Sequence, residues 1–76
     1  MKEIYEVLNS DDKLLSAHAG VIIDLEKEFR DGNLSKEEYT EVLEDIQRTV
    51  SISKGANSVA LQGLLITGVA NILKVL

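Results

Sequence analysis

The sequence predicts an all-α protein, in which an antiparallel helical hairpin and an apolar C-terminal helix form a small helical bundle. Apolar residues recur at spacings of three and four through the first 50 residues, which is typical of amphipathic helices. Turn and capping residues cluster between positions 32 and 38. The chain contains no Pro, and residues 55–73 include no charged side chain. We treat residues 1–76 as one domain, with acidic helices in 1–54 and the apolar helix in 55–76.

The length of the chain makes additional sources of stability important. A chain of 76 residues buries only about 60% of its unfolded surface, so its own core is marginal. There is no Cys for disulfides or thiolate metal sites, and His18 is the only histidine. We therefore expect no cofactor, and we expect self-association or a protein partner to stabilise the fold. Residues 1–6 are acidic and lack the apolar stretch of a secretory signal, which favours a cytoplasmic location.

Charge is distributed unevenly along the chain. All thirteen acidic residues lie at or before Asp45, so residues 1–45 have a net charge of −8 and residues 46–76 a net charge of +3. Nucleic-acid binding depends on neutralising phosphates with basic side chains, so the acidic part argues against it. The same acidity leaves open a role as an acidic inhibitor of a host enzyme or of a nucleic-acid-binding protein.

Two helices are expected before the hairpin turn. Residues 2–8 predict a short helix, and residues 9–12 interrupt it, although a kink within one longer helix is an alternative. We expect Ser10 to be the N-cap of the next helix, which should run from about Asp11 to Arg30. Its apolar stripe contains Leu15, His18, Ile22, Leu25 and Phe29, and is widened by Leu14 and Val21.

The hairpin turn is the best-defined boundary in the sequence. Gly32 fits the left-handed position that ends a helix. Ser35 and Glu38 have the spacing of a capping box, and Leu34 and Tyr39 have the spacing of a hydrophobic staple. The third helix is expected from Lys36 to about Ser53, antiparallel to the second. Its predicted stripe is Tyr39, Val42, Leu43, Ile46 and Val50, and its acidic back is Glu37, Glu41, Glu44 and Asp45.

Residues 25–46 resemble a known interaction module. The segments LEKEF at 25–29 and DGNLSKEEY at 31–39, followed by Val42-Leu43, are similar to the SHOCT module, a short helical hairpin. The resemblance implies oligomerisation or interaction, and it supplies no active-site residue. The same turn resembles half of an EF-hand loop, but Lys27 and Phe29 stand where calcium binding needs acids.

No arrangement of residues predicts an enzyme. The acidic back of the third helix is expected to be a solvated face, since carboxylates three and four residues apart on an exposed face repel each other. His18 falls within an apolar stripe, which favours a core or interface histidine. The sequence lacks a Cys nucleophile and a glycine-rich phosphate loop.

The last helix is expected to begin near Asn57 or Ser58, after a stop signal at Lys54-Gly55. It is apolar almost all round, because its four polar residues fall on opposite sides. A strand over residues 64–69 is the alternative, but the chain offers it no partner strand. We expect this helix to cover the hairpin, and to have more apolar surface than one hairpin can bury.

The surplus apolar surface is the basis of the functional prediction. We expect a non-enzymatic protein–protein interaction protein that forms a homo-oligomer through its C-terminal helix. Docking of this helix into a partner's groove is an alternative. Another is a small membrane-inserting or membrane-anchored protein, since residues 59–76 reach the lower length limit of a span. The predicted interaction residues are Leu61, Leu64, Leu65, Val69, Ile72 and Leu73.

Overall fold

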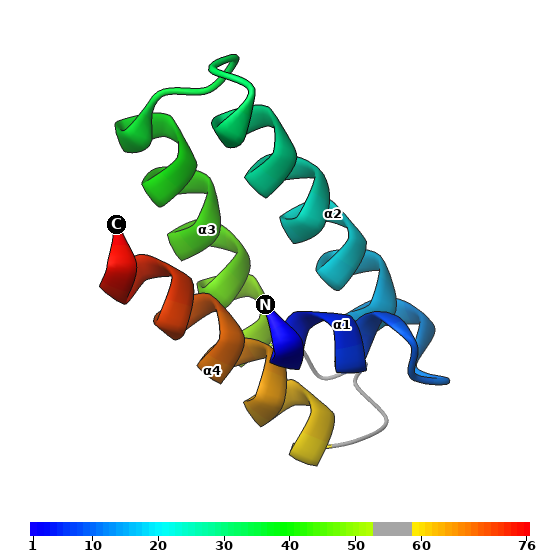
Figure 1. Ribbon diagram of the computed structural model, residues 1–76. Helices are drawn as coiled ribbons and strands as arrows, with labels where there is room; N and C mark the ends of the chain where they lie inside the picture. The colour runs from blue at the N-terminus through cyan, green and yellow to red at the C-terminus, as the bar shows by residue number, and fades with distance from the viewer. Residues whose placement is uncertain (53–58) are drawn as a thin grey trace.

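The chain folds into four helices (Figure 1). The computed structural model describes residues 1–52 and 59–76. Helix α1 spans Lys2–Leu8, α2 spans Lys13–Arg30, α3 spans Lys36–Ser51 and α4 spans Val59–Val75. The all-α prediction is confirmed, and the alternative of a strand over residues 64–69 is wrong because this segment lies within α4. The expected stop at Lys54-Gly55 and the expected caps Asn57 and Ser58 lie outside the described residues.

The hairpin turn forms as local chemistry predicts. Gly32 has a φ of +82°, and its N–H donates to the Phe29 carbonyl while the Asn33 N–H donates to the Glu28 carbonyl. This is the Schellman arrangement, which satisfies carbonyls at the end of α2. The capping box is also present: Ser35 accepts from the Glu38 N–H, and the Glu38 carboxylate accepts from the Ser35 N–H. These bonds fix α2 and α3 as an antiparallel hairpin.

The junction between α1 and α2 differs from the prediction. Asp12, not Ser10, is the N-cap of α2, and its side chain accepts a hydrogen bond of 3.0 Å from the Leu15 N–H. Ser10 instead donates from Oγ to the Val7 carbonyl at 2.6 Å, and Ser16 Oγ donates to the Leu8 carbonyl at 2.7 Å. The hydroxyls thus satisfy carbonyls at the end of α1. The kinked single helix is wrong, because residues 9–12 form a separate connection.

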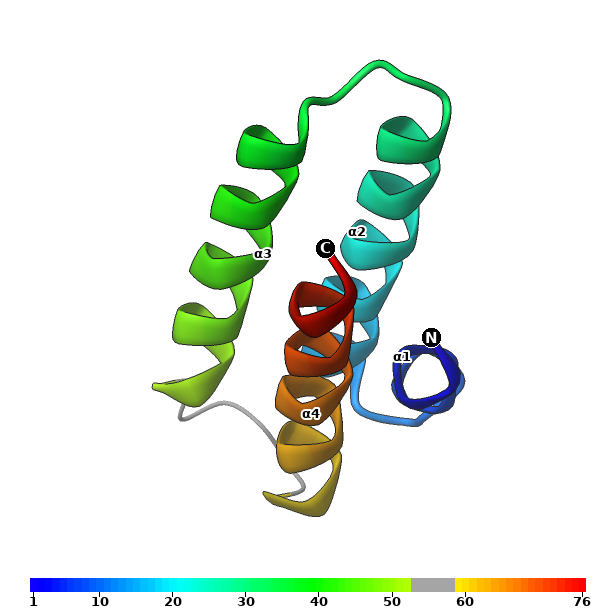
Figure 2. The same cartoon turned by 60° about the vertical axis from the view of Figure 1, so that its left-hand side comes forward.

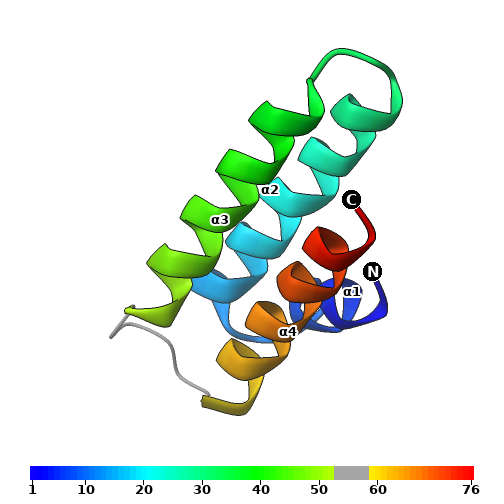
Figure 3. The same ribbon diagram turned by 90° about the vertical axis from the view of Figure 1, so that its left-hand side faces the viewer.

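Helix α1 packs against α2 and α4 and runs transverse to the other three helices (Figure 2). Figure 2 looks down the axis of α1 while α2, α3 and α4 run up the picture. Helix α4 lies beside α3 (Figure 3) and packs chiefly against α3 and α1. Every helix contributes to one core, whose buried members are Ile4, Val7, Leu15, Ala19, Ile22, Tyr39, Leu43, Ile46, Val50, Leu65, Val69 and Ile72.

Two expectations about the core require correction. Leu14 and Val21 are exposed, so they do not widen the buried stripe of α2; both lie off the line of Leu15, Ala19 and Ile22. The apolar surplus of the last helix was inferred by considering the hairpin as its only cover, but α1 packs against α4 as well. Much of the apolar surplus inferred from the sequence is therefore buried within one chain.

Candidate functional site

The six predicted interaction residues lie at two different depths. Leu65, Val69 and Ile72 belong to the buried core, where they contribute to the folding of a single chain. Leu61, Leu64 and Leu73 are partly exposed and pack at the edge of that core. Only the second group can reach another molecule without unfolding the chain. The prediction therefore places some association residues where a partner cannot contact them in this fold.

A different set of α4 residues faces solvent. We call the exposed residues Ala60, Gly63, Thr67 and Ala70 the small-residue face. Their spacing of three, four and three puts them on one side of the helix. At 100° per residue, Leu64 borders this face on one edge, and Ile66 and Leu73 border it on the other. The result is a shallow strip between larger, half-buried apolar side chains, which is uncharged from Ala60 to Ala70 and is followed on the same side of the helix by Lys74.

The two glycines of α4 distinguish the two sides of the helix. A Cβ placed on Gly68 would lie 2.6 Å from Ile4 Cδ1 and 3.2 Å from Glu3 Cβ, so α1 crosses α4 closely here and a larger residue would require the Ile4 side chain to shift. A Cβ placed on Gly63 would have no neighbour within 4 Å.

Polar residues of α4 attach the helix to its neighbours. Gln62 donates to the Val50 carbonyl, and Gln47 of α3 donates to the Ile66 carbonyl at 3.3 Å. Asn71 donates from Nδ2 to Glu3 Oε1 at 3.2 Å, which connects α4 to α1. In the sequence, Gln62 and Asn71 are two of the four polar residues that interrupt an otherwise apolar segment. Both orient α4 so that its small-residue face points outward.

The charged side chains form solvated surfaces. Glu37, Glu41, Glu44 and Asp45 are exposed along the back of α3, as expected. Arg48 pairs with Asp45 at 2.9 Å, and Arg30 pairs with Glu26 at 2.8 Å. Within residues 1–52 and 59–76, no group of three or more acidic or histidine side chains could hold a metal ion. His18 is half-buried at the margin of the core.

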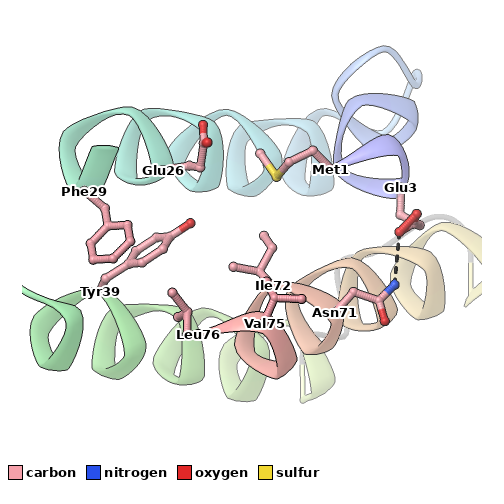
Figure 4. A pocket seen from close by; sticks show the side chains of 9 residues that line it. All are labelled: Met1, Glu3, Glu26, Phe29, Tyr39, Asn71, Ile72, Val75 and Leu76. Atoms are coloured by element: carbon pink, nitrogen blue, oxygen red, sulfur yellow. Dashed lines mark hydrogen bonds between the residues drawn. The ribbon is translucent and has the colours of Figure 1, made fainter. Parts of the chain in front are cut away.

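A pocket of about 430 Å³ lies at the end of the bundle where the two chain ends meet. We call it the end pocket (Figure 4). Its apolar walls come from α2, α3, α4 and the two chain ends, and its polar groups are Glu3 of α1, Glu26, Asn71 and the Tyr39 hydroxyl. Its lining consists of Met1, Glu3, Glu26, Phe29, Tyr39, Asn71, Ile72, Val75 and Leu76.

Tyr39 lies at the floor of the end pocket. Its ring stacks on Phe29 with centroids 4.7 Å apart, and only 1% of the residue is exposed. Its hydroxyl points into the pocket (Figure 4) and has no hydrogen-bond partner among the described residues. Burial raises the pKa of this hydroxyl, the Glu26 carboxylate adds to the rise, and Arg30 opposes it. The hydroxyl is therefore neutral at physiological pH and can both donate and accept.

Comparison with known proteins identifies no relative. The chain matches no family model, no curated protein and no solved structure. The resemblance of residues 25–46 to the SHOCT hairpin thus stays a prediction. Among the helices within the described ranges, none combines the length and apolarity that crossing a membrane requires.

Proposed function

We propose that this protein is a non-enzymatic interaction protein that self-associates through the small-residue face of α4. The observation that carries the proposal is an exposed helix surface without charge, since residues 59–73 contain no charged side chain. The exposed surfaces of α2 and α3 instead carry numerous acidic and basic side chains. An uncharged strip beside charged surfaces is the surface of this chain best suited to contact with protein.

A second copy of the chain is the partner that best suits this face. Glycine and alanine allow two backbones to approach closely. A two-fold axis brings the same surface of each copy together, so the strip meets an equally shallow strip. In that arrangement, the half-buried rim residues Leu64 and Leu73 of each copy become covered. Part of the predicted interaction set therefore retains a role at the edge of the contact.

The distribution of charge favours pairing through α4. Residues 1–45 have a net charge of −8, whereas residues 46–76 have a net charge of +3. Contact through α4 keeps the strongly acidic hairpins of two copies on the outside. Repulsion between them is screened beyond about 10 Å at 0.1 M salt. Association should consequently strengthen, not weaken, as salt is added.

Two further considerations agree with self-association. A chain of this length has a marginal core, and pairing adds buried surface without disulfides or metal. The resemblance of residues 25–46 to the SHOCT hairpin implies an interaction role as well. Neither consideration requires catalytic residues.

Sedimentation velocity on three proteins tests the proposal. The wild-type chain should sediment as an oligomer without detergent. Ala70→Glu adds a charge to the small-residue face at an exposed position and should give a monomer with unchanged helical circular dichroism. Ala17→Glu makes the same change at an exposed position of α2 and should leave the oligomer intact.

Two results would overturn the proposal. One is a monodisperse wild-type monomer, and the other is an Ala70→Glu protein that remains oligomeric. Flotation of the wild-type monomer with liposomes would favour the membrane alternative instead. Leu65→Asp is not a suitable test, because Leu65 is fully buried and the variant would lose its fold as well as its partner.

A further inference from the structure

We propose that the end pocket binds an amphipathic organic amine, with its ammonium group at the Tyr39 hydroxyl and the Glu26 carboxylate and its apolar body against Ile72 and Val75. This site is separate from the small-residue face. The pocket volume of about 430 Å³ lies within the range of about 300–1,000 Å³ that is usual for small-molecule sites. Its apolar lining with few polar groups also has the composition of such sites.

The unpartnered Tyr39 hydroxyl is the first reason to expect a ligand. A buried polar group without a hydrogen bond costs about 1–3 kcal/mol, whereas phenylalanine would fill the same space without that cost. Phe29, which stacks on the Tyr39 ring, shows that the stack itself does not require a hydroxyl. The hydroxyl points into the pocket (Figure 4), where its oxygen can accept from a ligand N–H.

The charges that face the pocket determine the class of ligand. Glu3 and Glu26 both line it, and no Lys or Arg side chain does among its described lining residues. The neighbouring cations are Arg30, which pairs with Glu26, and the α-amino group of Met1. Each carboxylate has one oxygen in a bond already, Glu3 Oε1 with Asn71 and Glu26 Oε2 with Arg30. The second oxygen of each is not used by these bonds. An ammonium group can therefore make charge-assisted hydrogen bonds here, while an anion would be repelled.

The apolar part of the ligand has a defined place as well. Ile72, Val75 and Leu76 line the α4 side of the pocket, and Met1 lines the opposite side (Figure 4). Met1 and Leu76 are only partly buried, so this side of the pocket is open to solvent. The site thus combines apolar walls with a carboxylate, Glu26, on the side of the Tyr39 hydroxyl (Figure 4).

Three probes that share the same alkyl chain length but differ in head group test this assignment. Isothermal titration calorimetry with decylammonium, decanol and decanoate, each below its critical micelle concentration, compares a cationic, a neutral and an anionic ligand. We expect decylammonium to bind most tightly and decanoate not to bind. Tyrosine fluorescence in a Tyr5→Phe protein then locates the site, because Tyr39 becomes the only tyrosine in a chain without Trp.

Matched variants distinguish the site from general attraction to an acidic protein. Tyr39→Phe and Glu26→Gln should each weaken decylammonium binding about tenfold, the equivalent of one hydrogen bond to a charged group. Glu44→Gln removes a carboxylate from the exposed back of α3 and should leave the affinity unchanged. The thermal midpoint of Tyr39→Phe should not fall, because the substitution removes an unsatisfied buried group.

Several outcomes would overturn the assignment. They are equal binding of all three probes, an unchanged affinity in Tyr39→Phe, and an equal loss of affinity in Glu44→Gln. The affinity of the Ala70→Glu variant for decylammonium separates the ligand proposal from the self-association proposal. This variant should retain full affinity for decylammonium whether or not the wild type is oligomeric, so failure of one proposal leaves the other testable.

Discussion

The two sides of α4 are built from the same kinds of residue, but one side is buried and the other is exposed. On the inner side, Leu65, Val69 and Ile72 are buried, and Gly68 allows α1 to cross. On the outer side, the small-residue face is exposed, and Gly63 has open space around it. Gly68 thus permits close packing within the chain, whereas the surroundings of Gly63 are open. The proposed self-association would use the second of these two sides.

The largest expected difference between the two sides comes from adding a charge to each. Leu65→Asp places a carboxylate in the core, and it should cost roughly 4 kcal/mol or more, which is most of the stability of a small domain. Ala70→Glu should change the free energy of unfolding by less than about 0.5 kcal/mol, since its site is exposed. Circular dichroism in urea measures both. Equal stability of the two variants would show that α4 has no distinct inner side.

The crossing at Gly68 should give the next largest effect. Gly68→Ala brings its methyl group against Ile4 and Glu3, and overpacking of this kind typically costs about 1–3 kcal/mol. Ile4→Val removes Cδ1, the closest of the contacting atoms, so it should recover part of the loss. A double-mutant cycle by urea unfolding measures this coupling. Additive effects of the two substitutions would contradict the close crossing.

The same substitution on the outer side should have the opposite sign. Gly63→Ala meets no atom within 4 Å, and alanine is favoured over glycine within helices by about 1 kcal/mol. We expect a gain of that size in the free energy of unfolding. Measurement in the Ala70→Glu background removes any contribution from association. A loss of stability there would mean that the outer side is more closely packed within the chain than the structure shows.

Removal of the Glu38 charge from the capping box should have the smallest effect on stability. It also provides a reference outside α4. The Ser35 N–H and hydroxyl lower the pKa of Glu38 below its ordinary value of 4.5. The Glu38 carboxylate therefore binds a proton more readily in the unfolded chain than in the folded one. Its contribution to the free energy of unfolding is full above pH 4.5 and is lost as the pH falls through the lower folded-state pKa. Glu38→Gln preserves the box without the charge and should remove this part of the acid dependence. Identical acid unfolding curves for the two proteins would refute the role of the carboxylate.

The sequence was a good guide where structure depends on near neighbours. Gly32, Ser35 and Glu38 act within a few residues of each other, so the hairpin boundary could be predicted from their spacing. The start of α2 was less certain, because Ser10, Asp11 and Asp12 are all good N-cap residues. Which of them caps depends on where α1 ends and on the carbonyls that Ser10 and Ser16 satisfy there.

The sequence was a poor guide to which side of α4 is buried. A helix that is apolar all round gives no periodicity from which its inner face could be deduced. The inner face is set by contacts distant in sequence, such as Ile4 against Gly68 and Asn71 with Glu3. The end pocket depends on the same contacts, since it is lined by both chain ends and the hairpin. Three of the six predicted interaction residues consequently proved to be core residues.

A distance measurement between copies tests the central proposal most directly. The chain has no Cys, so Val59→Cys introduces one thiol for a nitroxide label at an exposed position of α4 outside the small-residue face. If this face mediates self-association, double electron–electron resonance should give a well-defined distance between labels on two copies. The distance should disappear when Ala70→Glu is added. The absence of any dipolar signal between copies, or its persistence with Ala70→Glu, would contradict the proposal.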